Sequence, residues 1–161
     1  MKTAINFFGC PGSYKSTYAA SLFGDMKRLK YDVELIPEYA KQLTWEKRTK
    51  TLENQVAVFG RQYEAMCIPD TQYIVTDSPL ILTLLYNKGW LVLNQLALNC
   101  HTEFKNINFL LKLKDYDPKG RNQTLFEALE LQTKLIYILN SNNIPYLELE
   151  HYNFEMIKNF L

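Results

Sequence analysis

A glycine-rich segment near the N-terminus carries the residues whose types and spacing are best suited to chemistry. Residues 9–17 read GCPGSYKST, between a short apolar run and a segment with helical spacing. A turn of this kind that opens a helix directs several backbone N–H groups toward one point, where the helix dipole adds a positive field. Lys15 adds a full positive charge to the same turn. The segment therefore predicts a site for a phosphorylated ligand.

The spacing of this segment resembles the Walker A phosphate loop, G-x-x-x-x-G-K-[ST]. In that pattern the loop backbone cradles the phosphates of ATP, and Lys15 reaches the β- and γ-phosphates. The Ser16 hydroxyl then ligates Mg²⁺, and Thr17 bonds the α-phosphate. The residues predicted to bind the cofactor from this loop are Gly9, Pro11, Gly12, Ser13, Tyr14, Lys15, Ser16 and Thr17.

One position departs from the pattern, because Tyr14 stands where the motif has glycine. A positive φ angle at this position, or a nucleotide passing close to it, would make a tyrosine costly or obstructive. A phosphate loop that has lost its nucleotide, or a chance glycine-rich turn, is therefore the alternative interpretation.

Two carboxylates follow the second and third predicted strands. Asp77, in the segment IVTDSP, stands where a Walker B acid holds Mg²⁺, and its alternative role is to cap the helix that begins near Pro79. Glu38, in IPEYAK, is positioned to orient an acceptor hydroxyl or to take its proton, and its alternative is a solvated residue in the first turn of a helix. If Ser16 is the main protein ligand of Mg²⁺, Asp77 aligns the acceptor in place of Glu38.

A basic loop around residues 114–122 reads KDYDPKGRN and is predicted to be a short lid. A lid excludes water, and Arg121 would meet the charge that develops during phosphoryl transfer as both a catalytic and a cofactor-binding residue. The alternative is an ordinary charged surface loop.

Further candidates for contact with an acceptor are Tyr39, Arg61 and Gln62. Arg61 and Gln62 fall in a predicted helix, where such side chains are usually solvated. Tyr39, Trp45 and Tyr63 are candidates for stacking on a base, although aromatic residues at helical spacing more often belong to a core.

Strands and helices alternate along the chain, which predicts an α/β fold with a parallel sheet and helices on both of its faces. The predicted strands are 3–8, 32–36, 73–76, 107–113 and 145–149. The predicted helices are 15–30, 51–67, 80–87, 91–104 and 125–140. Ligands of such sheets bind beyond the carboxyl ends of the strands, so the chemistry is expected near residues 9–17, 37–40, 77–79 and 114–122.

The composition describes one globular domain over residues 1–161 and excludes a disordered chain or a fibre. Eighteen Lys and Arg against 17 Asp and Glu give a net charge of +1, which disfavours a polyanion such as DNA as partner. The three widely spaced cysteines indicate neither a disulfide framework nor a zinc site. No signal peptide or membrane-spanning segment is indicated, so the expected location is the cytoplasm, without membrane partners, and no feature indicates an oligomeric state.

Together these segments resemble the small P-loop kinases. The most similar family is the nicotinamide-riboside-kinase-like domain of bacterial NAD-biosynthesis regulators, with related small ATPase/kinase (AAA-like) proteins. The resemblance spans nearly the whole chain, through FFGCPGSYKST, PEYAK, GRQYE, IVTDSPL, DPKGR and PYLELE. It implies a P-loop three-layer α/β/α sandwich with strand order 2-3-1-4-5, ATP and Mg²⁺ as cofactors, and a nucleoside-like acceptor. It assigns the phosphate loop to Lys15, Ser16 and Thr17, the acceptor-side acid to Glu38, the Mg²⁺ acid to Asp77 and the lid arginine to Arg121.

Three functions follow from these observations. The first is a phosphotransferase that moves the γ-phosphoryl group of Mg-ATP to a hydroxyl or phosphate of a small nucleoside- or nucleotide-like acceptor. The second is a kinase that acts on a hydroxymethylated base in DNA, which the charge disfavours. The third is a non-catalytic nucleotide-binding or regulatory module, for which Tyr14 is the reason.

Overall fold

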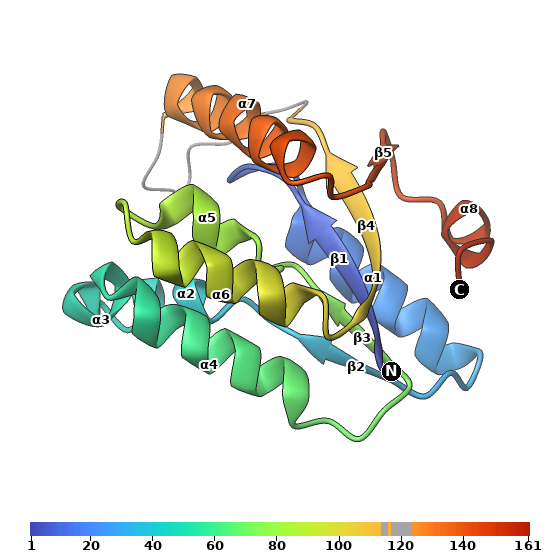
Figure 1. Ribbon diagram of the computed structural model, residues 1–161. Coiled ribbons are helices and arrows are strands. Elements are labelled where there is room, and N and C mark those ends of the chain that lie inside the picture. The colour runs from blue at the N-terminus through green and yellow to red at the C-terminus, as the bar shows by residue number, and fades with distance from the viewer. Residues whose placement is uncertain (114–115, 117–123) are drawn as a thin grey trace.

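The computed structural model describes residues 1–113, 116 and 124–161. Its centre is a sheet of five parallel strands in the order β2-β3-β1-β4-β5 (Figure 1). The strands are β1 (Thr3–Phe8), β2 (Val33–Ile36), β3 (Tyr73–Thr76), β4 (Lys105–Leu111) and β5 (Leu147–Leu149). The α/β/α sandwich with strand order 2-3-1-4-5 is therefore confirmed.

Helices cover both faces of the sheet and bury separate core clusters against it (Figure 1). On one face lie α1 (Lys15–Arg28) and α8 (Phe154–Lys158). On the other lie α4 (Gln55–Cys67), α5 (Leu82–Tyr86), α6 (Leu91–His101) and α7 (Leu125–Ser141). This double cover explains why all six residues of β1 are buried and why that strand reads as a nearly continuous apolar run.

The polar exception in β1 is Asn6, which points away from the α1 side and ties β1 to β4. Its amide nitrogen donates to the side-chain oxygens of Asn106 and Asn108, both at 2.9 Å. Buried amides are tolerated when they are hydrogen-bonded in this way. The central pair of strands is thus held in register by side chains as well as by backbone.

The helix predicted over residues 51–67 is two helices, α3 (Thr49–Glu53) and α4. The break falls at Asn54, whose side chain accepts a hydrogen bond from the backbone N–H of Ala57 at 3.2 Å and so caps α4. An asparagine side chain forms hydrogen bonds with nearby backbone groups that compete with those of a continuous helix, and so favours a helix end. Two further short helices, α2 (Tyr39–Trp45) and α8, were not predicted, because segments of 7 and 5 residues show too little periodicity.

The predicted lid around residues 114–122, with Arg121, lies outside the described residues apart from Tyr116. The lid and the single-domain extent of 1–161 therefore stay predictions. In the part of the chain that the structure describes, no helix is both long and apolar enough to cross a membrane.

Candidate functional site

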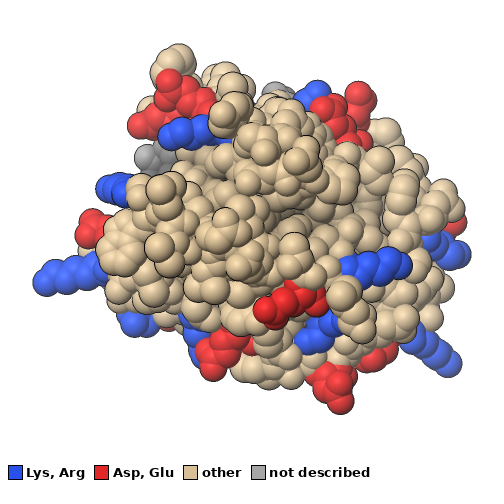
Figure 2. All heavy atoms as spheres, in the orientation of Figure 1, with Lys and Arg blue, Asp and Glu red and all other residues tan. Residues whose placement is uncertain are grey.

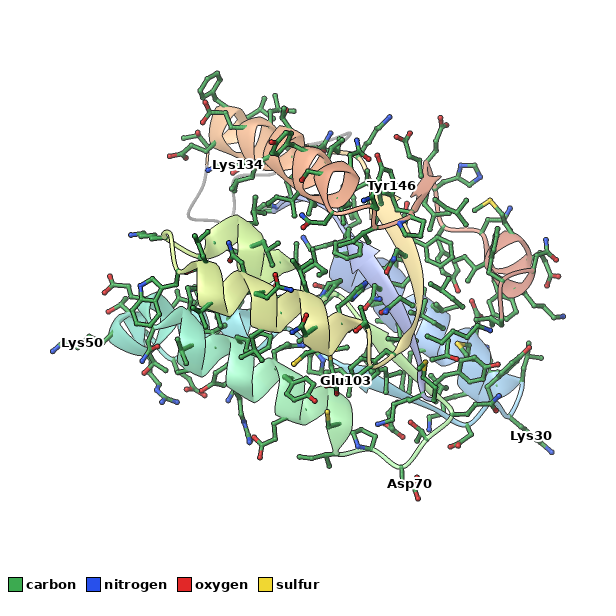
Figure 3. All side chains as sticks on the ribbon, viewed as in Figure 1. Lys30, Lys50, Asp70, Glu103, Lys134 and Tyr146 are labelled. Carbon is green, nitrogen blue, oxygen red and sulfur yellow. The ribbon has the colours of Figure 1, made fainter. Side chains whose placement is uncertain are left out.

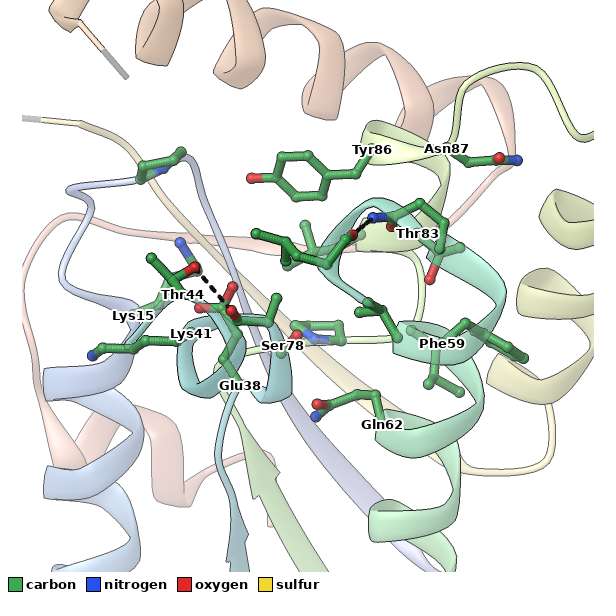
Figure 4. A pocket seen from close by; sticks show the side chains of 18 of the residues that line it. Lys15, Glu38, Lys41, Thr44, Phe59, Gln62, Ser78, Thr83, Tyr86 and Asn87 are labelled. Atoms are coloured by element: carbon green, nitrogen blue, oxygen red, sulfur yellow. Dashed lines mark hydrogen bonds between the residues drawn. The ribbon is translucent and has the colours of Figure 1, made fainter. Parts of the chain in front are cut away.

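A cavity of about 1250 Å³ opens at the carboxyl edge of the sheet (Figure 4). Its wall is formed by the segments that follow β1, β2 and β3, completed by residues of α2 to α6. Among the predicted site residues, those that line it are Pro11, Gly12, Ser13, Tyr14, Lys15, Ser16, Thr17, Glu38 and Gln62. Parallel α/β sheets bind their ligands at this edge, since the strand-to-helix loops meet there.

The loop between β1 and α1 is a tight turn that its own residues hold in place. Gly9 and Gly12 have φ angles of 154° and 98°, which favour glycine. A Cβ atom on Gly9 would lie 2.2 Å from the Ser13 hydroxyl and 2.8 Å from the carbonyl oxygen of Leu111. Inside the turn, the backbone N–H and the hydroxyl of Ser13 both donate to the carbonyl of Cys10, at 3.2 and 2.9 Å. Close packing thus requires glycine at position 9, and the positive φ angle favours glycine at position 12.

The ammonium group of Lys15 lies against this loop. Its Nζ donates to the carbonyl oxygen of Cys10 at 2.9 Å and the side chain lines the cavity. An ammonium group carries three donors and is able to bond more than one acceptor at once. The positive charge therefore lies where the phosphate-loop pattern requires it.

Tyr14 adopts the left-handed conformation, with φ 64° and ψ 19°, directly before α1. This conformation costs a residue with a side chain about 1 kcal/mol or more, so the loop keeps the geometry suited to glycine at the expense of strain. The Tyr14 side chain is 51% exposed and lies on the wall of the cavity. The substitution therefore alters the lining of the site while the turn itself is preserved.

Asp77, Ser16 and Glu38 line a smaller hollow of about 440 Å³ beside the loop. Asp77 is 5% exposed, and among the described residues its Oδ1 atom has no hydrogen-bond partner. It does not cap α5, because the residue before that helix is Ile81 and no side chain caps it. A buried carboxylate oxygen without a partner is costly unless a cation or a donor meets it.

These oxygen groups fit Mg²⁺. Magnesium is usually held by one or two carboxylates together with substrate phosphates and water, not by a cage made only of protein. The described residues contain no cluster of three or more His, Cys, Asp or Glu. Asp77 and the Ser16 hydroxyl are the residues that would hold the ion.

Glu38 lies at the end of β2, directly before α2, where four influences set the pKa of its carboxyl group. Burial raises this pKa most strongly, the positive charge of Lys15 lowers it, the negative charge of Asp77 raises it, and Lys41 lowers it. The net direction is upward from the ordinary value. A carboxylate of raised basicity in a cavity is suited to accept a proton.

Sequence analysis grouped Arg61 with Gln62, and the structure separates them. Gln62 is 5% exposed and lines the cavity, whereas Arg61 is exposed, pairs with Glu64 at 2.5 Å and lies outside the cavity lining. Tyr39 contributes its backbone N–H, which donates to the Oε1 atom of Gln62 at 3.1 Å, while its side chain is outside that lining as well.

Lys41, from α2, and Tyr86, from the end of α5, line the cavity and were not predicted. Trp45 of α2, a predicted candidate for stacking on a base, also lines the cavity, whereas Tyr63 is outside that lining. Trp45 is 75% exposed, which is unusual for so large an apolar side chain. The signal for Lys41 was its position three residues after Glu38, which places both on one side of a helical turn.

No protein-family model and no curated protein matches this chain. Among solved structures, thymidylate kinase from Ehrlichia chaffeensis aligns with a TM-score of 0.65 and 18% identity over 99% of both chains. The NadR protein in complex with NR aligns with a TM-score of 0.69 and 13% identity, over 93% of this chain and 46% of that chain. At such identities the likeness shows the fold alone, which this chain shares with both structures.

Proposed function

We propose that the protein is a phosphotransferase that moves the γ-phosphoryl group of Mg-ATP to a hydroxyl or phosphate of a nucleoside- or nucleotide-like acceptor. The observation that carries this proposal is the shared cavity: the phosphate loop with Lys15 and the half-buried Glu38 line the same space. The fold is common to kinases of nucleotides and to the NadR protein, which agrees with the proposal.

The chain's own residues divide the task. Lys15, together with Arg121 from the predicted lid, neutralises the charge on the transferring phosphoryl group. Ser16 and Asp77 would hold Mg²⁺, which supplies charge stabilisation across the phosphates when it is bound. Glu38 aligns the acceptor hydroxyl and takes its proton. Little covalent chemistry is needed, because phosphoryl transfer depends mainly on positioning and electrostatics.

One observation favours a second function, a module that binds nucleotide without transferring phosphate. Tyr14 places a strained, aromatic residue in the phosphate loop, on the wall of the cavity. Tight ATP binding without transfer to any acceptor would support that function. The face shown in Figure 2 does not favour the DNA-directed alternative, because positive and negative side chains are interspersed on it and form no continuous positive stripe.

The test is a transfer assay with ATP, Mg²⁺ and a panel of nucleosides and nucleotides, in which mass spectrometry detects an acceptor that gains one phosphoryl group. We expect the wild-type protein to phosphorylate at least one acceptor, and Lys15→Ala to reduce transfer by at least about 100-fold. Lys134→Ala is the matched control, because Lys134 is exposed on α7 outside the cavity lining (Figure 3). Absence of ATP binding, or equal activity of Lys15→Ala and wild type, contradicts the proposal.

A further inference from the structure

The wall of the cavity contains a buried amide whose donor group is unused. Gln62 lies on α4 and is 5% exposed, and among the described residues its Nε2 atom has no hydrogen-bond partner. Its Oε1 atom accepts from the backbone N–H of Tyr39 at 3.1 Å. The opposite orientation of the amide would place an NH₂ group against that N–H, two donors face to face. The contact with Tyr39 therefore fixes which end of the amide remains for a ligand.

The position of Gln62 distinguishes this unused group from a packing defect. Three buried side-chain atoms lack a partner in the part of the chain that is described: Asn6 Oδ1, Gln62 Nε2 and Asp77 Oδ1. Asn6 lies within the sheet, whereas Gln62 and Asp77 line the two hollows at its carboxyl edge. Unpartnered buried polar groups are rare, and those that line a cavity have a ready partner in a bound ligand.

The surroundings of Gln62 indicate the shape of that ligand. Phe59 precedes it by nearly one turn of α4, and the apolar side chains of Phe59, Leu80 and Leu93 line the same cavity. Glu38 lines it from the end of β2, and in Figure 4 the Gln62 amide points from α4 toward the space beside Glu38 and Ser78. A donor group within an apolar wall fits a planar ring or amide that carries a polar atom at one edge.

We propose that Gln62 selects the acceptor by donating a hydrogen bond to a carbonyl oxygen on its ring or amide group. An acceptor with an amino group at the same edge would place donor against donor and leave both unsatisfied. The acceptor is thus a carbonyl-bearing nucleoside or a similar planar amide. The identification of this ligand as the phosphoryl acceptor rests on the proposed function, but the test measures binding alone and needs no phosphoryl transfer.

The experiment compares nucleosides that differ in one exocyclic group, uridine with cytidine and inosine with adenosine, by calorimetry without ATP. We expect the wild-type protein to bind the carbonyl member of at least one pair about 10-fold or more tightly than its amino counterpart. Gln62→Glu keeps an oxygen for the Tyr39 N–H and replaces the donor by an acceptor, so the preference should invert. Gln62→Met removes the polar group at similar length and should bring the ratio close to one.

The control is Gln95→Glu, the same chemical change at an exposed position of α6 outside the cavity lining, which should leave the preference unchanged. If the Gln62 variants do not fold, the wild-type ratios alone decide. Equal binding within both pairs, a preference for the amino members, or no binding of uridine and inosine overturns the inference. Failure of the proposed function is recognised separately, because it appears as loss of ATP binding or of transfer by the wild-type protein.

Discussion

The two sides of the cavity are held in different ways. The phosphate-loop side consists of nine consecutive residues, 9–17, in which Ser13 and Lys15 both bond to the carbonyl of Cys10. The opposite side is assembled from α2, α3 and α4 and from the segment after β3. Among the described residues, Gln62 Nε2 on this side and Asp77 Oδ1 in the adjoining smaller hollow have no hydrogen-bond partner. One side is a closed local structure, whereas the other is complete only with a ligand. Substitution of a loop glycine should therefore change mainly stability, whereas substitution of a side chain that has no partner in the structure should change mainly binding and activity.

Asp77→Asn should give the largest effect on activity. Loss of the carboxylate charge removes a predicted Mg²⁺ ligand, and we expect transfer to fall by about 100-fold or more at saturating ATP. The free energy of unfolding should be unchanged or higher, because an unpartnered buried charge is removed. Transfer assays and urea denaturation of the same preparations measure both quantities. Full activity of Asp77→Asn at low Mg²⁺ concentration would contradict this role.

Gly9→Ala should show the opposite pattern, a large loss of stability. Its Cβ would meet the Ser13 hydroxyl at 2.2 Å and the Leu111 carbonyl at 2.8 Å, so we expect a loss of about 2–4 kcal/mol in the free energy of unfolding. The matched control is Gly60→Ala in α4, where a Cβ meets nothing within 4 Å and helix propensity favours alanine by up to about 1 kcal/mol. Urea denaturation should therefore shift in opposite directions for the two variants, and equal shifts would contradict the account of the loop.

Asn54→Ala should have a smaller effect, confined to the ligand-dependent side. Removing the cap of α4 should cost about 1 kcal/mol and weaken acceptor binding, since α4 carries Gln62. Asn153→Ala removes the equivalent cap of α8, whose side chain accepts from Met156 N at 3.1 Å, on the face of the sheet covered by α1. We expect a similar loss of stability in both variants, with weaker acceptor binding only for Asn54→Ala. Weaker binding in both would show that general destabilisation is the cause.

The smallest effect is a pH dependence that arises from Glu38. Burial raises the pKa of this carboxyl above its ordinary value of 4.5, and the negative charge of Asp77 raises it further. The positive charges of Lys15 and Lys41 lower the pKa but do not cancel the effect of burial. Between pH 4.5 and the pKa of the folded state, the Glu38 carboxyl is protonated in the folded protein and ionised in the unfolded chain. The stabilisation is present below pH 4.5 and is lost as the pH rises through the folded-state pKa.

Urea denaturation at a series of pH values, without nucleotide or magnesium, measures this contribution. The free energy of unfolding of wild type relative to Glu38→Gln should fall as the pH rises above about 4.5. A difference that is constant or rises with pH would show that the Glu38 carboxyl is not held in its protonated form by the fold.

The same contrast between the two sides explains what could be predicted from the sequence. The phosphate loop could be placed because its chemistry lies in consecutive residues between a strand and a helix, and the apolar strands could be found because both faces of the sheet are covered. The strand order followed from the resemblance and not from the periodicity. Glu38 and Asp77 were found because the carboxyl ends of parallel strands share an edge.

The ligand-dependent side was harder to predict, because it depends on how distant segments meet. Nothing local separates Gln62, which is buried in the cavity wall, from Arg61, which is exposed and paired with Glu64. The break at Asn54 and the short helix α2 decide which residues line the cavity, and both are too brief to leave a periodic pattern. Lys41 was missed for this reason.

The central claim is that the phosphate loop and the opposite wall, which contains Gln62, belong to one binding cavity. The most direct test is the binding of a single molecule that contacts both the loop and that wall. Adenosine and uridine joined by a polyphosphate chain should bind the wild-type protein about 10- to 100-fold more tightly than ATP, because linkage makes the second contact intramolecular. Lys15→Ala should weaken the binding of both ligands, whereas Gln62→Met should weaken only that of the linked molecule. Binding no tighter than that of ATP, or binding indifferent to Gln62→Met, would contradict the account.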